Sequence, residues 1–331
     1  MFQQKTLADA KTMFMSALSD SNQIGNCKTS KHIQPDDSWE EMEIELPESY
    51  DWREKYPQCV QPVRDIGPKF NCSSSYIFAS LGVAEDRICM GSNNTVQLSA
   101  QEILDCDDNQ FGCDGGYGNK VLTWGKKKGF IAEECHNDYS GKANECEVDH
   151  LESNTCRIEN KVYKVNDFCL AMQAENIKRE IFKNGPVLGQ MVPFTDFLAY
   201  KEGSYHKTQE SFKFNGFHLV KIVGWSQSID GSDEWIVENS WGESWGEKGY
   251  VKIMGGRGDS QIDFYALGVS VSPYTMYDYY SMSNMANSAA NINMEDDDSS
   301  DSSDAGDAEP ATMEDVQNIL DQMGADIVDA D

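Results

Sequence analysis

Residues 239–253 read NSWGESWGEKGYVKI, a segment in which tryptophans and glycines lead into a short strand-like run. Three other runs of strand-like composition precede or overlap it: GPVLGQMVP at 185–193, GFHLVKIVGW at 216–225 and EWIVENSW at 234–241. Short runs rich in Val and Ile and bounded by Gly or Pro are typical of β-strands. The second half of the folded part of the chain is therefore predicted to form antiparallel strands.

The first half carries helical patterns instead. The stretch SSSYIFASLGVAEDRIC at 73–89 has apolar residues distributed broadly, as a buried central helix would. SAQEILDC at 99–106 opens with Ser99 and Glu102 at capping-box spacing, and NIKREIFKNG at 176–185 ends in Gly185 before a proline. Helices followed by antiparallel strands predict an α+β fold of two lobes with a cleft between them.

Composition divides the 331 residues into three parts. Residues 1–46 are polar and form an N-terminal extension, with a short amphipathic helix expected near its start. Residues 47–274 hold nearly all the Trp, Gly and Cys and form the folded body. Residues 275–331 contain fifteen Asp and Glu but no Lys or Arg, which predicts an acidic, disordered tail. Near its end, residues 312–330 carry a capping box and one apolar face, typical of a short amphipathic helix.

The formal net charge of −29 argues against nucleic acid as a partner, because phosphate binding needs clustered Lys and Arg. No stretch approaches the ~18 apolar residues of a membrane span. The five histidines form no HxxxH pair, so we expect neither a metal site nor another cofactor.

The signals for cellular location conflict. The first twenty residues lack the continuous apolar stretch of a secretory signal, which favours a cytoplasmic or cytoskeletal setting. Ten cysteines, none in a CxxC pair, favour a disulfide framework and therefore a secretory or lysosomal ancestry. Both interpretations stay open.

The ordered motifs resemble those of the papain-like cysteine peptidases, most closely their cathepsin B-like branch. LPESYDWREKYPQC at 46–59 is similar to the start of the mature enzyme, and NCSSSYIFAS at 71–80 to the helix of the nucleophile. GCDGGY at 112–117 resembles the glycine pair of the substrate cleft, GFHLVKIVGW the strand of the catalytic histidine, and NSWGESWGEKGYVKI the asparagine motif. The resemblance covers about residues 47–270 and implies a papain-like two-lobe fold.

The resemblance also implies roles for individual residues of the site. Ser75 stands at the nucleophile position, His218 is the base, Asn239 orients the imidazole, Trp241 shields that hydrogen bond, Ile66 stands at the oxyanion position, and Gly115 and Gly116 line the cleft.

Several of these positions depart from the family pattern. The nucleophilic Cys is replaced by Ser75, and the oxyanion Gln by Ile66, whose side chain donates no hydrogen bond. Residues 68–71, PKFN, replace a single residue in the oxyanion loop, and bulky Phe217 precedes the histidine and is expected to fill the cleft beside it. Losing one oxyanion donor alone lowers the rate roughly 10²–10³-fold. These changes together predict a catalytically inactive protein.

Four disulfides follow from the same resemblance. The implied pairs are Cys59–Cys89, Cys72–Cys113, Cys106–Cys146 and Cys135–Cys156. The sequence assigns no partner to Cys27 or Cys169.

Three functions remain open at this stage. A pseudoprotease would bind a protein or peptide ligand with the old cleft or its surface. A Ser-dependent peptidase or hydrolase would use Ser75 with His218. A structural component of a larger assembly would attach through the acidic tail and its terminal helix. Residues 1–46 fall where the family carries an inhibitory propeptide, and we expect a remnant that stays attached.

Overall fold

The computed structural model describes residues 16–17, 24–28, 45–67, 72–146, 156, 159, 161–214, 216–229, 231–256 and 260–278. Three of the expectations above fall wholly or mostly outside these residues: most of the N-terminal helix, the inserted 68–71, and the acidic tail beyond residue 278 with the helix expected at 312–330. No helix in the described ranges is both long and apolar enough to cross a bilayer.

Helices gather in the first half of the described chain and strands in the second. The helices of seven residues or more are α3 (Ser75–Ser92), α4 (Ala100–Cys106), α5 (Gly118–Lys127) and α8 (Gln173–Asn184), and a short α2 spans Trp52–Lys55. The strands are β1 (Ser16–Ala17), β2 (Tyr50–Asp51), β3 (Gly116–Tyr117), β4 (Val165–Met172), β5 (Val187–Met191), β6 (Ser204–Tyr205), β7 (His218–Gln227), β8 (Asp233–Glu238), β9 (Tyr250–Met254) and β10 (Tyr265–Val271). The helices predicted at 73–89, 99–106 and 176–185 and the predicted strands of the second half have counterparts here. At residues 16–17, within the stretch where the N-terminal amphipathic helix was expected, the chain forms strand β1 instead, paired with β3.

Eight of these strands form one mixed, mostly antiparallel sheet. Its order is β4-β10-β5-β7-β8-β9-β6, and β2 pairs with β7 beside that path. The β7–β8 register places Lys221 opposite Glu238 and Trp225 opposite Trp235. Strand β7 is buried along most of its length, which explains its continuous apolar run.

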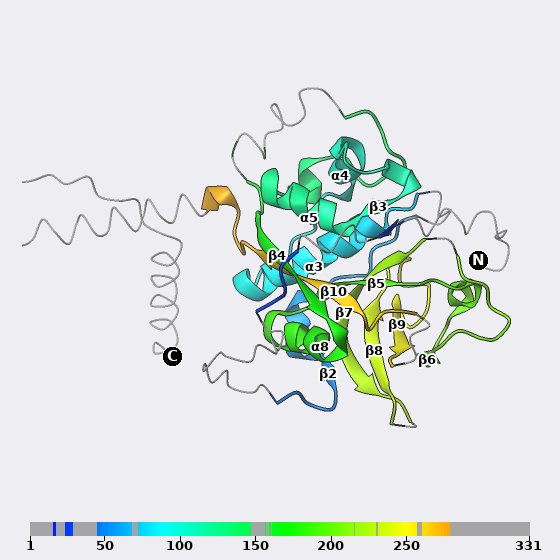
Figure 1. Cartoon of the computed structure of the whole chain (residues 1–331). Helices are drawn as coiled ribbons and strands as arrows, with labels where there is room; N and C mark the ends of the chain where they lie inside the picture. The colour runs from blue at the N-terminus through cyan, green and yellow to red at the C-terminus, as the bar shows by residue number, and fades with distance from the viewer. Residues whose placement is uncertain are drawn as a thin grey trace, which may run out of the picture.

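Helix α3 lies at the centre of the molecule, between α4 and α5 on one side and the sheet on the other (Figure 1). It is buried from Ser75 to Cys89, in line with the apolar residues that its sequence shows on all sides. It packs against β7 and β10 of the sheet. The fold is therefore α+β, with the start of α3 placed where the helical part meets the strands.

Five disulfides hold the described residues together. The four pairs implied by the resemblance are joined: Cys59–Cys89, Cys72–Cys113, Cys106–Cys146 and Cys135–Cys156. The fifth joins Cys27 to Cys169 and connects the N-terminal extension to β4.

Candidate functional site

His218 and Asn239 form a buried hydrogen-bonded pair. His218 is the first residue of β7, and Asn239 follows the last residue of the neighbouring β8. The His218 Nε2 and Asn239 Oδ1 atoms lie 2.8 Å apart, and the same oxygen accepts the Ser240 backbone N–H at 2.8 Å. The amide thus holds the imidazole in one orientation.

Aromatic rings enclose this pair. The Trp241 ring lies 5.1 Å from the His218 ring, centroid to centroid, and itself contacts Trp245 and Phe197 at 5.0 and 5.5 Å. Both tryptophans and Phe197 are fully buried. Rings packed this way keep water from the His218–Asn239 hydrogen bond.

Burial sets the charge of the histidine. It lowers the pKa of His218 to about 4, although the hydrogen bond with Asn239 acts in the opposite direction. An imidazole with no contact to solvent loses the hydration that stabilises its charged form. His218 is therefore neutral at pH 7.

Ser75 is the first residue of α3, and its side chain is fully buried. The Cys72–Cys113 disulfide and a hydrogen bond from the Ser73 N–H to the Cys113 carbonyl at 2.9 Å fix the chain just before the helix. A helix N-terminus favours a negative charge, which suits a thiolate. Ser75 offers a hydroxyl at this place.

Ile66 is buried in the wall of the site. Its N–H donates to the Ser240 carbonyl at 2.9 Å, which ties it to the segment that follows Asn239. Its carbonyl accepts a hydrogen bond from the Tyr139 hydroxyl at 3.3 Å. The side chain presents only methyl and methylene groups, so Ile66 donates only through its backbone.

The sequence did not indicate Tyr139, which the structure places next to the start of α3. Its hydroxyl lies 2.6 Å from the Ser74 Oγ, and its ring packs edge-on against Phe78 with centroids 4.7 Å apart. Burial raises the pKa of Tyr139 to about 12, so the hydroxyl keeps its proton. That proton is donated to the Ile66 carbonyl, so the Tyr139 oxygen can accept the Ser74 hydroxyl proton.

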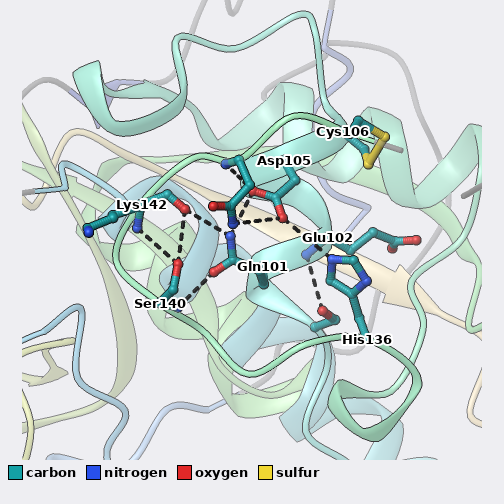
Figure 2. Close-up of polar contacts among 10 residues, drawn as sticks. Gln101, Glu102, Asp105, Cys106, His136, Ser140 and Lys142 are labelled. Atoms are coloured by element: carbon teal, nitrogen blue, oxygen red, sulfur yellow. Dashed lines mark hydrogen bonds and ion pairs between the residues drawn. A yellow bond between two sulfur atoms is a disulfide. The ribbon is translucent and has the colours of Figure 1, made fainter. Parts of the chain in front are cut away.

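Polar side chains of α4 hold the loop that carries Tyr139 (Figure 2). Gln101 accepts the Ser140 N–H at 2.8 Å and donates to the Lys142 carbonyl at 2.9 Å. Asp105 accepts hydrogen bonds from Gln101 at 2.7 Å and from the Asn144 N–H at 2.7 Å. The Cys106–Cys146 disulfide closes the same loop. These contacts to the backbone of the loop fix the position of Tyr139.

The glycine pair lies beside the same helix start. Gly115 has a φ of 109°, a conformation that favours glycine. A Cβ on Gly116 would lie 2.6 Å from the Tyr76 ring and 2.5 Å from the Gln110 side-chain oxygen. Gly116 begins β3, which pairs in parallel with Ser16–Ala17 of the N-terminal extension.

Phe217 is half-buried at the entrance to β7. The Lys213 Nζ lies 5.8 Å from the centroid of its ring. That Phe217 fills the cleft beside His218 stays a prediction.

A buried ion cluster lies beneath the site. Lys221, three residues beyond His218 on β7, contacts Asp86 of α3 at 2.7 Å and Glu238 of β8 at 3.0 Å. The three side chains are between 3 and 17% exposed. The cluster links the elements that begin with Ser75 and His218 to the one that leads into Asn239. A lysine inside the apolar run HLVKIVGW is the one sequence signal that points to it.

Within the described residues, one group combines three potential metal ligands: Cys27, Cys169 and Glu180. The two sulfurs are bonded to each other, and Glu180 pairs with Arg87 at 3.1 Å. A disulfide provides no thiolate, so this group does not form a metal site in its oxidised form.

Comparison with known proteins identifies the family. The sequence profile described as "Papain family cysteine protease" matches residues 46–269. The chain therefore belongs to the papain family of cysteine proteases.

Within this family the chain is similar to cathepsin B-like proteins. It is 32% identical to Cathepsin B-like CP1 of Giardia intestinalis over 230 residues, which are 68% of this chain and 73% of the relative. It is 30% identical to Cathepsin B-like CP3 of the same organism over 229 residues, covering 68% and 74%. The solved structure of proCathepsin B S9 from Trypanosoma congolense matches with a TM-score of 0.67 at 25% identity, covering 82% of this chain and 90% of that one. The papain-like fold expected from the motifs is confirmed.

Proposed function

We propose that this chain is a catalytically silent papain-family protein that uses its cleft or surface to hold a peptide or protein partner. The observation that carries the proposal is Ser75, a hydroxyl at the position where the family motif has a thiol. A thiol near pKa ~8.5 is readily ionised at a helix N-terminus, whereas an alkyl hydroxyl has no comparable anionic population. Ser75 therefore depends fully on a general base.

His218 is a weak base in its buried surroundings, and the oxyanion donor is missing. An imidazole whose pKa is about 4 rather than 6.5 accepts a proton at an extra cost of ~3 kcal/mol, which lowers the rate by up to about 10²–10³ because a general base feels only part of that cost in the transition state. Replacing the oxyanion donor by the Ile66 side chain removes about another 10²–10³. If the two effects act independently, the reaction slows by up to about 10⁴–10⁶.

One observation favours a second candidate, a Ser-dependent hydrolase. His218 is neutral and held by Asn239, which is the protonation state and orientation that a general base requires.

Hydrolysis of a pool of fluorogenic peptides separates the two candidates. The wild type is compared with Ser75→Ala and Ser75→Cys, each as full-length protein. We expect no turnover in the wild type. Turnover that disappears in Ser75→Ala would establish the hydrolase and contradict the proposal. Activity in Ser75→Cys alone would show that the cleft is intact and inactive only because an oxygen replaces the sulfur. No activity in any of the three proteins would favour a role in which the surface binds a partner.

The flanking segments extend this proposal. We infer that residues 1–46 are a propeptide remnant that stays attached, because maturation serves no purpose without activity. The acidic tail from residue 275, with the helix predicted at 312–330, is proposed as the attachment point for an assembly partner. Deleting 312–331 should release the protein from that assembly while its urea unfolding midpoint is unchanged.

A further inference from the structure

The N-terminal extension is covalently fixed to the edge of the sheet. Cys27 forms a disulfide with Cys169 of β4, which is the terminal strand of the sheet order. The Cys27 N–H donates to the Leu170 carbonyl at 3.0 Å, and the Leu170 N–H donates to the Gly25 carbonyl at 2.8 Å. Residues 25–27 thus extend the sheet edge, with the disulfide beside their hydrogen bonds.

The same extension has a second attachment at the glycine pair. Ser16 lies opposite Gly116, and Ala17 opposite Tyr117, in the parallel β1–β3 pairing. Strand β1 also lies against α3 and β7, the two elements that begin with Ser75 and His218. Nine residues of sequence, 18–26, separate this strand from Cys27.

We propose that the Cys27–Cys169 disulfide is a redox latch, which holds the extension on the site independently of the backbone connection and releases that hold when a dithiol reduces it. A two-residue ladder holds a free peptide weakly, because few hydrogen bonds must offset the entropy of association. A nine-residue link to the sheet edge keeps that strand at an effective concentration on the order of 1 mM. The latch therefore replaces the backbone connection through residues 29–44.

The surroundings of the disulfide give a reductant access to one sulfur. An open pocket of about 660 Å³ is lined by Cys169, together with Lys28 of the extension and Lys183 of α8. The same pocket is also lined by Arg87, Asp167 and Glu180, and the Glu180 carboxylate, within 4.8 Å of both sulfurs, is paired with Arg87. The remaining surplus of positive charge favours the approach of an anionic thiolate. The Cys59–Cys89 disulfide, by contrast, has both of its cysteines fully buried.

The exchange balances in two steps. The first thiolate of the dithiol bonds to the Cys169 sulfur, the Cys27–Cys169 bond breaks, and its electron pair leaves with Cys27, which takes a proton. The second thiol of the dithiol, as thiolate, displaces Cys169 and closes the reductant's own disulfide. The reductant is oxidised by two electrons, and the protein gains two thiols.

Retention of the extension after cleavage tests the latch. A recognition sequence for a site-specific protease is inserted between Asp36 and Asp37 of the full-length chain, and the oxidised protein is cut. Native mass spectrometry then follows the loss of residues 1–36 over time. The same insertion is placed in Cys27→Ser/Cys169→Ser, which removes the latch, and in Cys135→Ser/Cys156→Ser, which removes a disulfide away from the extension.

We expect the cut wild type and the Cys135→Ser/Cys156→Ser control to keep the extension, and the latch variant to lose it at least tenfold faster. Graded dithiol should release it from the wild type in step with labelling of Cys27 and Cys169. Equal retention by the latch variant and the control, or retention in the wild type after both thiols are labelled, would overturn the proposal. The readout is the mass of the complex, so the result is independent of whether the cleft cuts or only binds peptides.

Discussion

The buried lysine beneath the site offers the sharpest test of what holds the two halves of that site in register. Lys221 is 7% exposed and lies between Asp86 at 2.7 Å and Glu238 at 3.0 Å. Burial alone would lower the pKa of Lys221, but the two carboxylates raise it above the ordinary value, so the amine is charged. Lys221→Met keeps most of the side-chain volume and removes only this charge.

The expected effect of Lys221→Met is large. It leaves two carboxylates inside the protein without their cation, and breaking a buried ion pair in this way costs about 3–5 kcal/mol of unfolding free energy. Lys126→Met is the matched control. Lys126 pairs with Asp167 at 2.9 Å, but the two side chains are 50% and 75% exposed. A pair of that kind contributes about 0–1 kcal/mol.

The loss should also depend on pH. Burial raises the pKa of Asp86 to about 7, and Lys221 is the group that opposes the rise. A carboxyl whose folded-state pKa lies above its unfolded value destabilises the protein as pH rises through the folded value. Without Lys221 that value rises further. The penalty of Lys221→Met is therefore largest at pH 8 and should fall below about 2 kcal/mol at pH 5, where Asp86 is protonated.

Urea unfolding of the oxidised protein at pH 8 and pH 5 measures both effects. A loss below 1 kcal/mol at pH 8, no larger than that of Lys126→Met, would refute the view that this cluster couples α3 to the sheet. A loss that does not change between the two pH values would refute the assignment of the penalty to ionised carboxylates.

Two further predictions concern residues next to the reacting positions. Burial lowers the pKa of His218 to about 4, so between pH 6.5 and 4 the unfolded chain binds a proton that the folded chain does not. The free energy of unfolding should therefore fall by about 2 kcal/mol from pH 7 to 4.5. His218→Gln should remove that part of the pH dependence in urea titrations. Tyr139→Phe removes the hydroxyl that contacts Ser74 and the Ile66 carbonyl and should cost about 1 kcal/mol in the same assay, whereas Tyr277→Phe, at a 50% exposed position, should change stability by less than about 0.5 kcal/mol.

Local patterns predicted the central elements because the information for each lies within a few residues. The broad apolar distribution at 73–89 corresponds to α3, and the run at 216–225 corresponds to β7, whose ends differ from the prediction by two residues. Strand β4 escaped prediction because its burial does not alternate: Asn166 and Asp167 are both exposed, while Leu170 and Ala171 are both buried. A sheet-edge strand with that pattern resembles a loop in sequence.

Which side chains contact one another could be seen only in the three-dimensional structure. Neither spacing nor composition connects Cys27 to Cys169, which are 142 residues apart, or Lys221 to Asp86 on α3. Tyr139 reaches Ser74 only because Gln101 and the Cys106–Cys146 disulfide hold its loop. Such contacts depend on how separate elements pack, and a single sequence carries no direct record of that packing.

Retention of the catalytic motifs is a weak argument for catalysis in this chain. His218 is fully buried and bonded to Asn239, and its ring packs against Trp241. Replacing any of these three leaves an unpaired polar group or a cavity in the core, each of which lowers stability by about 1–5 kcal/mol with or without a reaction. Packing alone therefore suffices to maintain the histidine and asparagine motifs. Packing does not select the chemical group at Ser75 and Ile66 in the same way. A hydroxyl and a methyl group fill these two buried positions as well as a thiol or an amide would. The chemical identity of those two positions, rather than the presence of the motifs, is what the hydrolysis experiment examines.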